Sequence, residues 1–265
     1  MTDWIHGHVH HRDAELHYYR SPKNALPPLV LCHGFSDNGL CWDRVSQALA
    51  ADFDIIMIDA RNHGLSSSGS VTSEDMIDDL AAVIRALDLG PTAALGHSMG
   101  AGTVAGLAAE HPGLVSKIIL EDPPWYDIHG ADAPTKGSQR VQNFKKFLEM
   151  VEKMSDAQLL AFGKTLRPNW QEDDFPAWMQ SKRQVNPLAL VGLRHSDWQA
   201  RVKKIKCPTL LIHADNSSDG ILKPSVINAV LGSNSRFSTQ EIKHSGHNIR
   251  RDQFEAYLST LREFL

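Results

Sequence analysis

The stretch Gly96-His97-Ser98-Met99-Gly100 places a serine midway between two glycines. The bare Gly-x-Ser-x-Gly pattern is weak evidence, because both residue types are common. Here it directly follows the apolar run 92–95 and precedes a helical pattern. A serine on such a strand-turn-helix elbow is presented for nucleophilic attack, and the helix start would place backbone N–H groups beside a developing oxyanion. The pattern therefore predicts Ser98 as a nucleophile and the Met99 N–H as an oxyanion donor.

Apolar runs bounded by turn residues indicate the strands that would carry this elbow. Two alternating runs open the chain, 5–10 and 16–19, as in an antiparallel hairpin. Continuous runs typical of buried parallel strands follow at 29–32, 55–58, 93–95, 118–120 and 210–212, with a later strand at 237–242. Helical patterns lie between the earlier runs, and an amphipathic one ends the chain at 251–265. This order predicts an α/β fold, with a mostly parallel eight-stranded sheet flanked by helices.

The alternation of strands and helices stops between residues 123 and 202, where the pattern is helical. We predict a helical cap (lid) at 123–202, inserted after the sixth strand into a core domain formed by 1–122 and 203–265. Four of the six tryptophans lie in this segment. A cap needs its own small core, so most of its aromatic side chains are expected to pack together. Others, such as Trp125, are expected to line a substrate pocket against the sheet.

The composition is that of an ordinary globular protein. The formal net charge of −4 comes from acidic and basic side chains that are mixed along the chain, which excludes a basic stripe for nucleic acid and favours a small-molecule substrate. The N-terminus has no basic segment before an apolar run, so we expect a cytoplasmic protein that does not contact membranes. Three cysteines without Cys-x-x-Cys spacing suit a reducing compartment. The sequence carries no indication of the oligomeric state.

Two further motifs resemble those of the α/β-hydrolase fold family, and the resemblance covers essentially the whole chain. His33-Gly34-Phe35 looks like the family's His-Gly-x oxyanion loop. The segment 59–66, Asp-Ala-Arg-Asn-His-Gly-Leu-Ser, looks like the family's Asp-x-Arg-x-His-Gly-x-Ser turn. The resemblance implies that the Phe35 N–H is the second oxyanion donor and that the His33 side chain braces the loop. It implies a structural role for His63, in the turn after the fourth strand.

The family order of nucleophile, acid and histidine helps to choose the base among fourteen histidines. Only His244 and His247 lie between the late strand and the last helix. His247 resembles the family's Gly-His motif, in which Gly246 lets the loop curl toward the nucleophile. We therefore expect His247 to take the serine proton and to return it to the leaving group. His244 is expected to be a polar loop residue.

The acid that orients His247 has two possible places in this fold. After the seventh strand, Asp219 resembles the usual acid by its downstream neighbours, although the preceding loop is longer than in the family pattern and Asp215 lies nearer to the strand. After the sixth strand, Asp122 resembles the acid of haloalkane dehalogenases and zearalenone lactonases. Two prolines directly follow Asp122 and would fix the direction of its carboxylate. We predict Asp122 as the acid, with Asp219 as the main alternative and Asp215 as a third candidate.

Three alternate histidines near the N-terminus, His6, His8 and His10, share one strand face and have the residue type of metal ligands. No carboxylate or cysteine is placed to complete such a site. We therefore expect a solvated hairpin face and no metal.

Together these residues predict a serine hydrolase, of the carboxylesterase or lactonase type, that cleaves a small carboxylic ester or lactone through an acyl-serine without a cofactor. A serine nucleophile excludes dehalogenation and epoxide opening, whose alkyl-enzyme intermediates need a carboxylate. One alternative is C–C bond hydrolysis, because Ser-Met-Gly also occurs in hydrolases of aromatic ring-cleavage products. Their acidic substrates would require an arginine in the cleft, such as Arg183 or Arg194. Another alternative is a non-hydrolytic or ligand-binding member of the fold.

Overall fold

The computed structural model describes residues 3–22, 25–126, 137–190, 197–215 and 219–265. Eight strands form one sheet in the order β1-β2-β4-β3-β5-β6-β7-β8. Their bounds are β1 Ile5–His11, β2 Ala14–Arg20, β3 Pro28–Cys32, β4 Asp54–Ile58, β5 Thr92–His97, β6 Val115–Glu121, β7 Thr209–Ala214 and β8 Phe237–Ile242. β2 is antiparallel to both β1 and β4, whereas β3 to β8 run parallel. The predicted eight-stranded, mostly parallel sheet is therefore confirmed.

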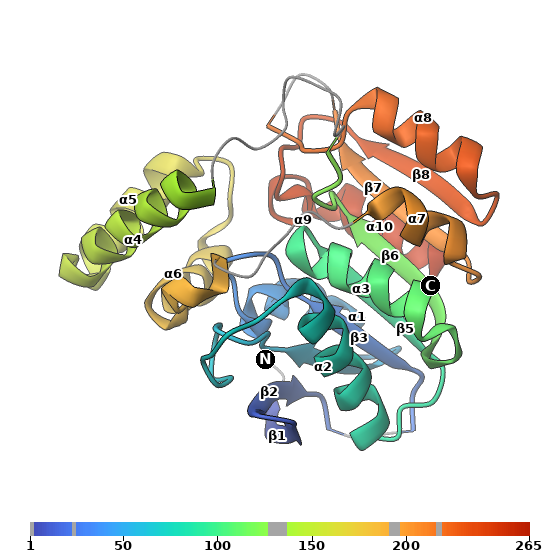
Figure 1. The fold of residues 1–265 in the computed structure, drawn as a ribbon. Coiled ribbons are helices and arrows are strands. Elements are labelled where there is room, and N and C mark those ends of the chain that lie inside the picture. The colour runs from blue at the N-terminus through green and yellow to red at the C-terminus, as the bar shows by residue number, and fades with distance from the viewer. Residues whose placement is uncertain (1–2, 23–24, 127–136, 191–196, 216–218) are drawn as a thin grey trace.

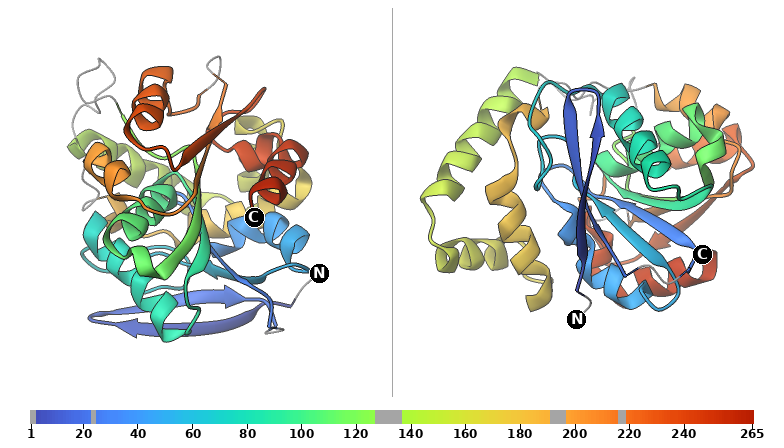
Figure 2. Two further views of the ribbon diagram at one scale, coloured as in Figure 1. Left: turned by 90° about the vertical axis from the view of Figure 1, so that its right-hand side faces the viewer. Right: turned by 90° about the horizontal axis from the view of Figure 1, so that it is seen from below.

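Helices cover both faces of this sheet (Figure 2). One apolar core joins the sheet to α2 (Ser73–Ala86), α3 (Met99–Glu110), α7 (Trp198–Lys204) and α8 (Pro224–Ser233). A second core on the opposite face includes side chains from α1 (Asp43–Leu49) and α10 (Phe254–Phe264). The predicted last helix is interrupted, because α9 (Ile249–Asp252) ends before Gln253, whose φ of −139° is not helical. Strands buried on both faces explain why their sequences are continuous apolar runs.

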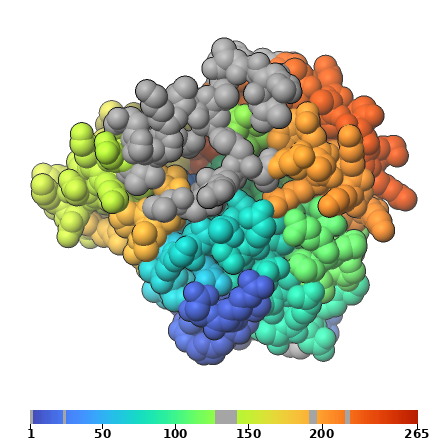
Figure 3. All heavy atoms as spheres, viewed as in Figure 1, coloured from blue at the N-terminus to red at the C-terminus, as the bar shows by residue number. Residues whose placement is uncertain are grey.

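Three helices stand to one side of the sheet in Figure 1: α4 (Gly137–Lys153), α5 (Asp156–Leu166) and α6 (Phe175–Gln184). We call them the outer helices. They and the turns around them share a separate small core built on Val151, Leu159, Trp170, Phe175 and Trp178. In the space-filling view they form a lobe at the left margin (Figure 3). This packing agrees with the expectation that most aromatic side chains of the segment pack against one another.

The two ends of the predicted cap segment pack differently from the outer helices. Trp125 is 2% exposed and Trp198 is 6% exposed, and both belong to the core that contains α3. Their rings stack with centroids 5.6 Å apart. The Trp125 ring is therefore enclosed by core side chains, a position that does not favour the predicted contact with substrate. Across the described residues, no helix combines the length and apolar character needed to cross a membrane.

Candidate active site

Ser98 lies on a sharp turn between β5 and α3, with φ 50° and ψ −116°. A Cβ on Gly96 would lie 2.4 Å from the Gly100 carbonyl oxygen, and one on Gly100 would lie 2.2 Å from the Cys32 carbonyl oxygen. Neither gap admits a side chain, so the two glycines are required by space. The Ser98 N–H is bound to the Glu121 carbonyl oxygen at 2.9 Å, which ties the strained turn to β6. The elbow predicted from the sequence is therefore present.

His247 lies between Ser98 and Asp122. Its Nε2 is 3.0 Å from the Ser98 Oγ, and its Nδ1 is 2.6 Å from the Asp122 Oδ2. Asp122 directly follows β6, has φ 43° and is fully buried. Its two carboxylate oxygens also accept from the backbone N–H groups of Ile221 and Leu222 at 2.8 and 3.0 Å. These two donors fix the carboxylate plane against the imidazole, so the three side chains form one connected relay.

The other candidate acids contact the same loop at backbone positions. The Asp219 Oδ1 accepts from the His247 N–H at 3.0 Å, and its Oδ2 accepts from Arg167 at 3.3 Å. Burial alone would raise the pKa of Asp219, but these two donors lower it below its usual value. Asp215 accepts from the His244 N–H. Neither aspartate is hydrogen-bonded to an imidazole nitrogen of His247, so both shape the loop that carries the base.

The predicted oxyanion loop forms a β-turn over Gly34 to Asp37. The Gly34 carbonyl accepts from the Asp37 N–H at 3.1 Å and from the His33 Nδ1 at 2.8 Å. The Phe35 ring and the Met99 side chain share a small apolar cluster. A Cβ on Gly34 would lie 3.4 Å from the Ser98 Cβ, so the backbone just before Phe35 passes beside the elbow. The Phe35 ring also meets Phe144 of α4 at a centroid distance of 4.7 Å.

Two buried histidines brace this loop. The His33 Nε2 accepts from the Ala60 N–H at 3.0 Å, and the His63 Nε2 accepts from the Ser36 N–H at 3.2 Å. Burial lowers the pKa of His33 and lowers that of His63 to about 3. Both rings are therefore neutral at physiological pH, which leaves their Nε2 lone pairs free to accept. These contacts are those of bracing residues, the roles that the motif resemblance implied for both.

A cluster of buried charges behind the site escaped the sequence reasoning. Asp37 accepts from Lys182 at 3.1 Å and from Arg250 at 3.0 Å, and Arg251 lies 3.2 Å away. Burial alone would raise the pKa of Asp37, but the three cations hold it well below its usual value. Arg250 also donates to Glu121, whose own pKa is raised by burial. Residue spacing gives no sign of this cluster, because Lys182 and Asp37 are 145 residues apart in the chain.

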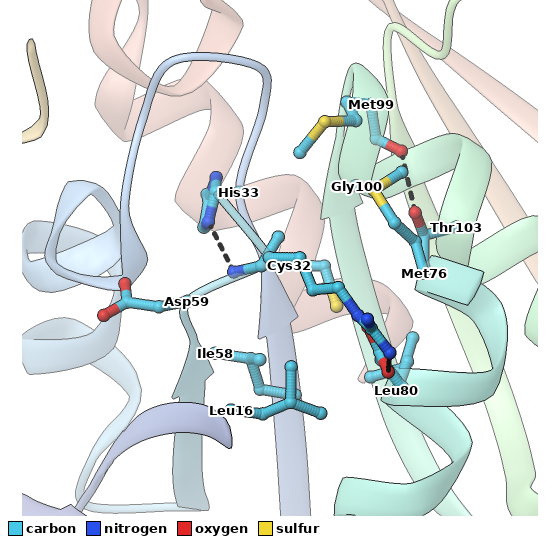
Figure 4. A pocket seen from close by; sticks show the side chains of 13 residues that line it. Leu16, Cys32, His33, Ile58, Asp59, Met76, Leu80, Met99, Gly100 and Thr103 are labelled. Carbon is cyan, nitrogen blue, oxygen red and sulfur yellow. Dashed lines mark hydrogen bonds and ion pairs between the residues drawn. The ribbon is translucent and has the colours of Figure 1, made fainter. Parts of the chain in front are cut away.

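A cavity of about 30 Å³ lies beside the elbow (Figure 4). Its lining includes Met99, Gly100 and Thr103 from α3, together with Cys32 and His33 from the end of β3. In Figure 4 the His33 ring is hydrogen-bonded across the cavity wall to the backbone that follows Asp59. The cavity has more room than one water molecule needs, and Ser98 is not among its lining residues. The cavity therefore lies beside the backbone of Met99 and Gly100 and does not include the nucleophile.

The N-terminal histidines lie on the hairpin. His6 Nδ1 lies 3.1 Å from the His17 Nε2, whereas His8 and His10 both face Glu15. Among the residues that the structure describes, no three histidine, cysteine, aspartate or glutamate side chains converge as metal ligands would.

A sequence model of the α/β-hydrolase fold family matches residues 27–249. The chain belongs to the α/β-hydrolase family. A 2-(acetamidomethylene)succinate hydrolase of Mesorhizobium japonicum is 32% identical over 130 residues. The matched stretch is 46% of this chain and 47% of the relative. A putative esterase/lipase of Haemophilus influenzae is 27% identical over 252 residues, which are 90% of this chain and 83% of the relative.

Solved structures of other α/β-hydrolases share the fold. The N-formylmaleamic acid deformylase of Pseudomonas putida aligns with a TM-score of 0.81 at 22% identity, over 97% of this chain and 100% of the deformylase. The predicted family and fold are thus confirmed, and the protein is a hydrolase of this fold.

Proposed function

We propose that this α/β-hydrolase cleaves a small carboxylic ester or lactone through an acyl-enzyme on Ser98. The observation that carries the proposal is the relay in which His247 meets the Ser98 Oγ at 3.0 Å and the Asp122 carboxylate at 2.6 Å. His247 takes the Ser98 proton as the Oγ attacks the carbonyl carbon, and then gives that proton to the leaving alkoxide. Water, deprotonated by His247 in turn, attacks the acyl carbon, and the imidazolium returns this proton to the Ser98 Oγ as the bond to the acyl group breaks and the carboxylic acid leaves. No step requires a cofactor.

Asp122 acts through the imidazole and does not touch the substrate. Its carboxylate accepts the Nδ1–H, so the Nε2 lone pair faces Ser98. The same carboxylate stabilises the imidazolium that forms during attack. The Met99 and Phe35 N–H groups bind the negative oxygen of the tetrahedral intermediate, because the first N–H groups of a helix have no intrahelical acceptor and the turn brings Phe35 close.

A second candidate is hydrolysis of a small amide by the same steps, with an amine or ammonia as the leaving group. Two relatives favour it, since one is named a 2-(acetamidomethylene)succinate hydrolase and the other an N-formylmaleamic acid deformylase. The C–C alternative finds less support in the described residues. Arg183 donates to the Met154 carbonyl and to Asp156 within the outer helices, and Arg194 lies outside the described residues.

The test compares the wild type with Ser98→Ala on p-nitrophenyl acetate, on a simple lactone and on an N-formyl amide. Ser259→Ala, at an exposed position of α10, is the matched control. We expect Ser98→Ala to lower kcat/KM on the preferred substrate by a factor of about 10⁴ or more, with Ser259→Ala unchanged. A fluorophosphonate probe should label the wild type and not Ser98→Ala. Undiminished hydrolysis by Ser98→Ala would overturn the proposal, and the ratio of ester, lactone and amide rates decides between the candidates.

A further inference from the structure

The turn that carries the Phe35 N–H contains a residue in a costly conformation. Ser36 has φ 63°, and the Asp37 N–H closes the turn onto the Gly34 carbonyl. A positive φ at the third position of a closed turn is typical of a type II turn, where glycine is favoured. A serine remains in such a conformation only when its surroundings hold it there.

Lys182, from outer helix α6, supplies that hold. Its Nζ donates to the Ser36 carbonyl at 2.6 Å, to the Ser36 Oγ at 3.0 Å and to the Asp37 Oδ1 at 3.1 Å. The side chain is 6% exposed, so these acceptors take the place of water around the ammonium group. Burial lowers the pKa of Lys182, and the Asp37 carboxylate opposes that shift.

Two rigid peptide planes connect Lys182 to the predicted oxyanion donor. The Ser36 carbonyl and the Asp37 N–H belong to one peptide unit, so the hydrogen bond from Lys182 fixes the direction of that N–H. The Asp37 N–H in turn holds the Gly34 carbonyl. The Gly34 carbonyl and the Phe35 N–H belong to a second peptide unit, in which they point in opposite directions. Fixing the carbonyl therefore fixes the N–H on the oxyanion side.

We propose that Lys182 is a positioning residue for the oxyanion hole, through which outer helix α6 holds the Phe35 N–H in its productive direction. The inference rests on the proposed function, because it takes Ser98 as the nucleophile and Phe35 as an oxyanion donor. Lys182 touches neither substrate nor nucleophile in this role. The outer helices thus contribute to the chemistry of the core through the Ser36 carbonyl.

Lys182 can be replaced without leaving the buried Asp37 carboxylate unpaired, because two arginines also contact it. In Lys182→Met the apolar stem is retained, and Asp37 keeps its ion pairs with Arg250 and Arg251. Arg183→Met is the matched control. Arg183 is the next residue of α6, and its side chain is directed to the Met154 carbonyl and to Asp156, away from the turn.

The experiment measures steady-state kinetics on the preferred substrate and hydrogen-deuterium exchange of the peptide that contains residues 33–38. For Lys182→Met we expect kcat to fall about tenfold or more, less than for complete loss of an oxyanion donor, with KM within about twofold of the wild type. Exchange in 33–38 should be faster. Arg183→Met should match the wild type in both measurements.

The double variant Lys182→Met/Ser36→Gly distinguishes loss of positioning from general destabilisation of the protein. Glycine adopts a positive φ without strain, so the turn no longer needs the lysine and part of kcat should return. Wild-type kcat and wild-type exchange in a folded Lys182→Met protein would overturn the inference. Absence of Ser98 labelling in the wild type would instead overturn the proposed function. In that case the exchange data alone would still show whether Lys182 holds the turn at Ser36.

Discussion

The Asp122 carboxylate lies 2.6 Å from the His247 Nδ1, although the two residues are 125 positions apart in the chain. Asp219, the rival candidate from the loop after β7, meets the same histidine only at its backbone N–H. The loop after β7 still contributes to the acid, because the N–H groups of Ile221 and Leu222 bind the Asp122 carboxylate. An aspartate therefore stands at both places where this fold can carry an acid. Only Asp122, after β6, is hydrogen-bonded to the imidazole.

This division of roles predicts different effects for two isosteric changes. Asp122→Asn replaces the acceptor at the Nδ1 with an amide that can donate, which favours the wrong imidazole tautomer. We expect kcat on the preferred substrate to fall by a factor of about 10³ to 10⁴, as in other serine hydrolases with this change. Steady-state kinetics measure the loss.

The matched variant is Asp219→Asn, whose amide oxygen can still accept the His247 N–H. It loses the ion pair with Arg167 and should retain kcat within about tenfold, because that ion pair is partly exposed and contributes little. The reverse ranking of the two variants would assign the acid to Asp219.

The tight elbow predicts opposite outcomes for two glycines that are two residues apart. In Gly100→Ala the new Cβ would lie 2.2 Å from the Cys32 carbonyl oxygen, which is backbone and cannot move aside. We expect a loss of about 3 kcal/mol or more in the free energy of unfolding, or no folded protein.

In Gly102→Ala the new methyl group finds its nearest neighbour 3.8 Å away, at Pro124, and the position lies inside α3. Here alanine should raise the free energy of unfolding by about 0.5 to 1 kcal/mol, because it has the higher helix propensity. Urea titration measures both variants, and equal effects at the two positions would contradict the close approach at Gly100.

The depressed pKa of His63 predicts a pH dependence of stability. Burial keeps His63 neutral down to about pH 3, whereas the unfolded chain binds the proton near the ordinary pKa of 6.5. Between these values the unfolded state binds more protons, so the free energy of unfolding falls as the pH falls. Replacing His63 with glutamine, which also offers a donor and an acceptor, removes one of the titrating groups.

Between pH 6 and 4.5 we therefore expect the free energy of unfolding to fall less steeply in His63→Gln than in the wild type. The two slopes should differ by about 1.4 kcal/mol per pH unit. The measurement is the slope of the free energy of unfolding against pH, from denaturant titrations at several pH values. This slope does not change if the substitution lowers stability equally at every pH. Ser259→Ala, at an exposed position of α10, removes no titrating group and should keep the wild-type slope. An unchanged slope in His63→Gln would show that the ring is already charged in the folded protein.

Burial also predicts inert thiols. It raises the pKa of Cys32 to about 12 and raises those of Cys41 and Cys207 above their ordinary value. Because the thiolate is the reactive form, Ellman's reagent at pH 8 should titrate all three thiols rapidly only after unfolding in guanidinium chloride. Rapid reaction of the folded protein with inactivation would place a reactive cysteine beside the site.

Local sequence determined the parts of the site whose geometry is local. The serine elbow depends on the end of a strand, two glycines and the start of a helix, which follow one another directly in the sequence. Each of these can be recognised from residue types alone. The parallel strands could likewise be predicted, since burial on both faces requires continuous apolar runs. The braces His33 and His63 followed from short motifs for the same reason.

Tertiary structure alone decided the partners that meet across long stretches of chain. The sequence favoured Asp122 over Asp219 without excluding Asp219, because the direction of a side chain at the end of a strand is set by the loops packed around it. The contact of Lys182 with Ser36 spans 146 residues and depends on how α6 packs against the loop after β3. The enclosure of Trp125 against Trp198 is of the same kind. Such contacts are fixed by packing and by pairing of buried charges, which residue spacing along the chain does not encode.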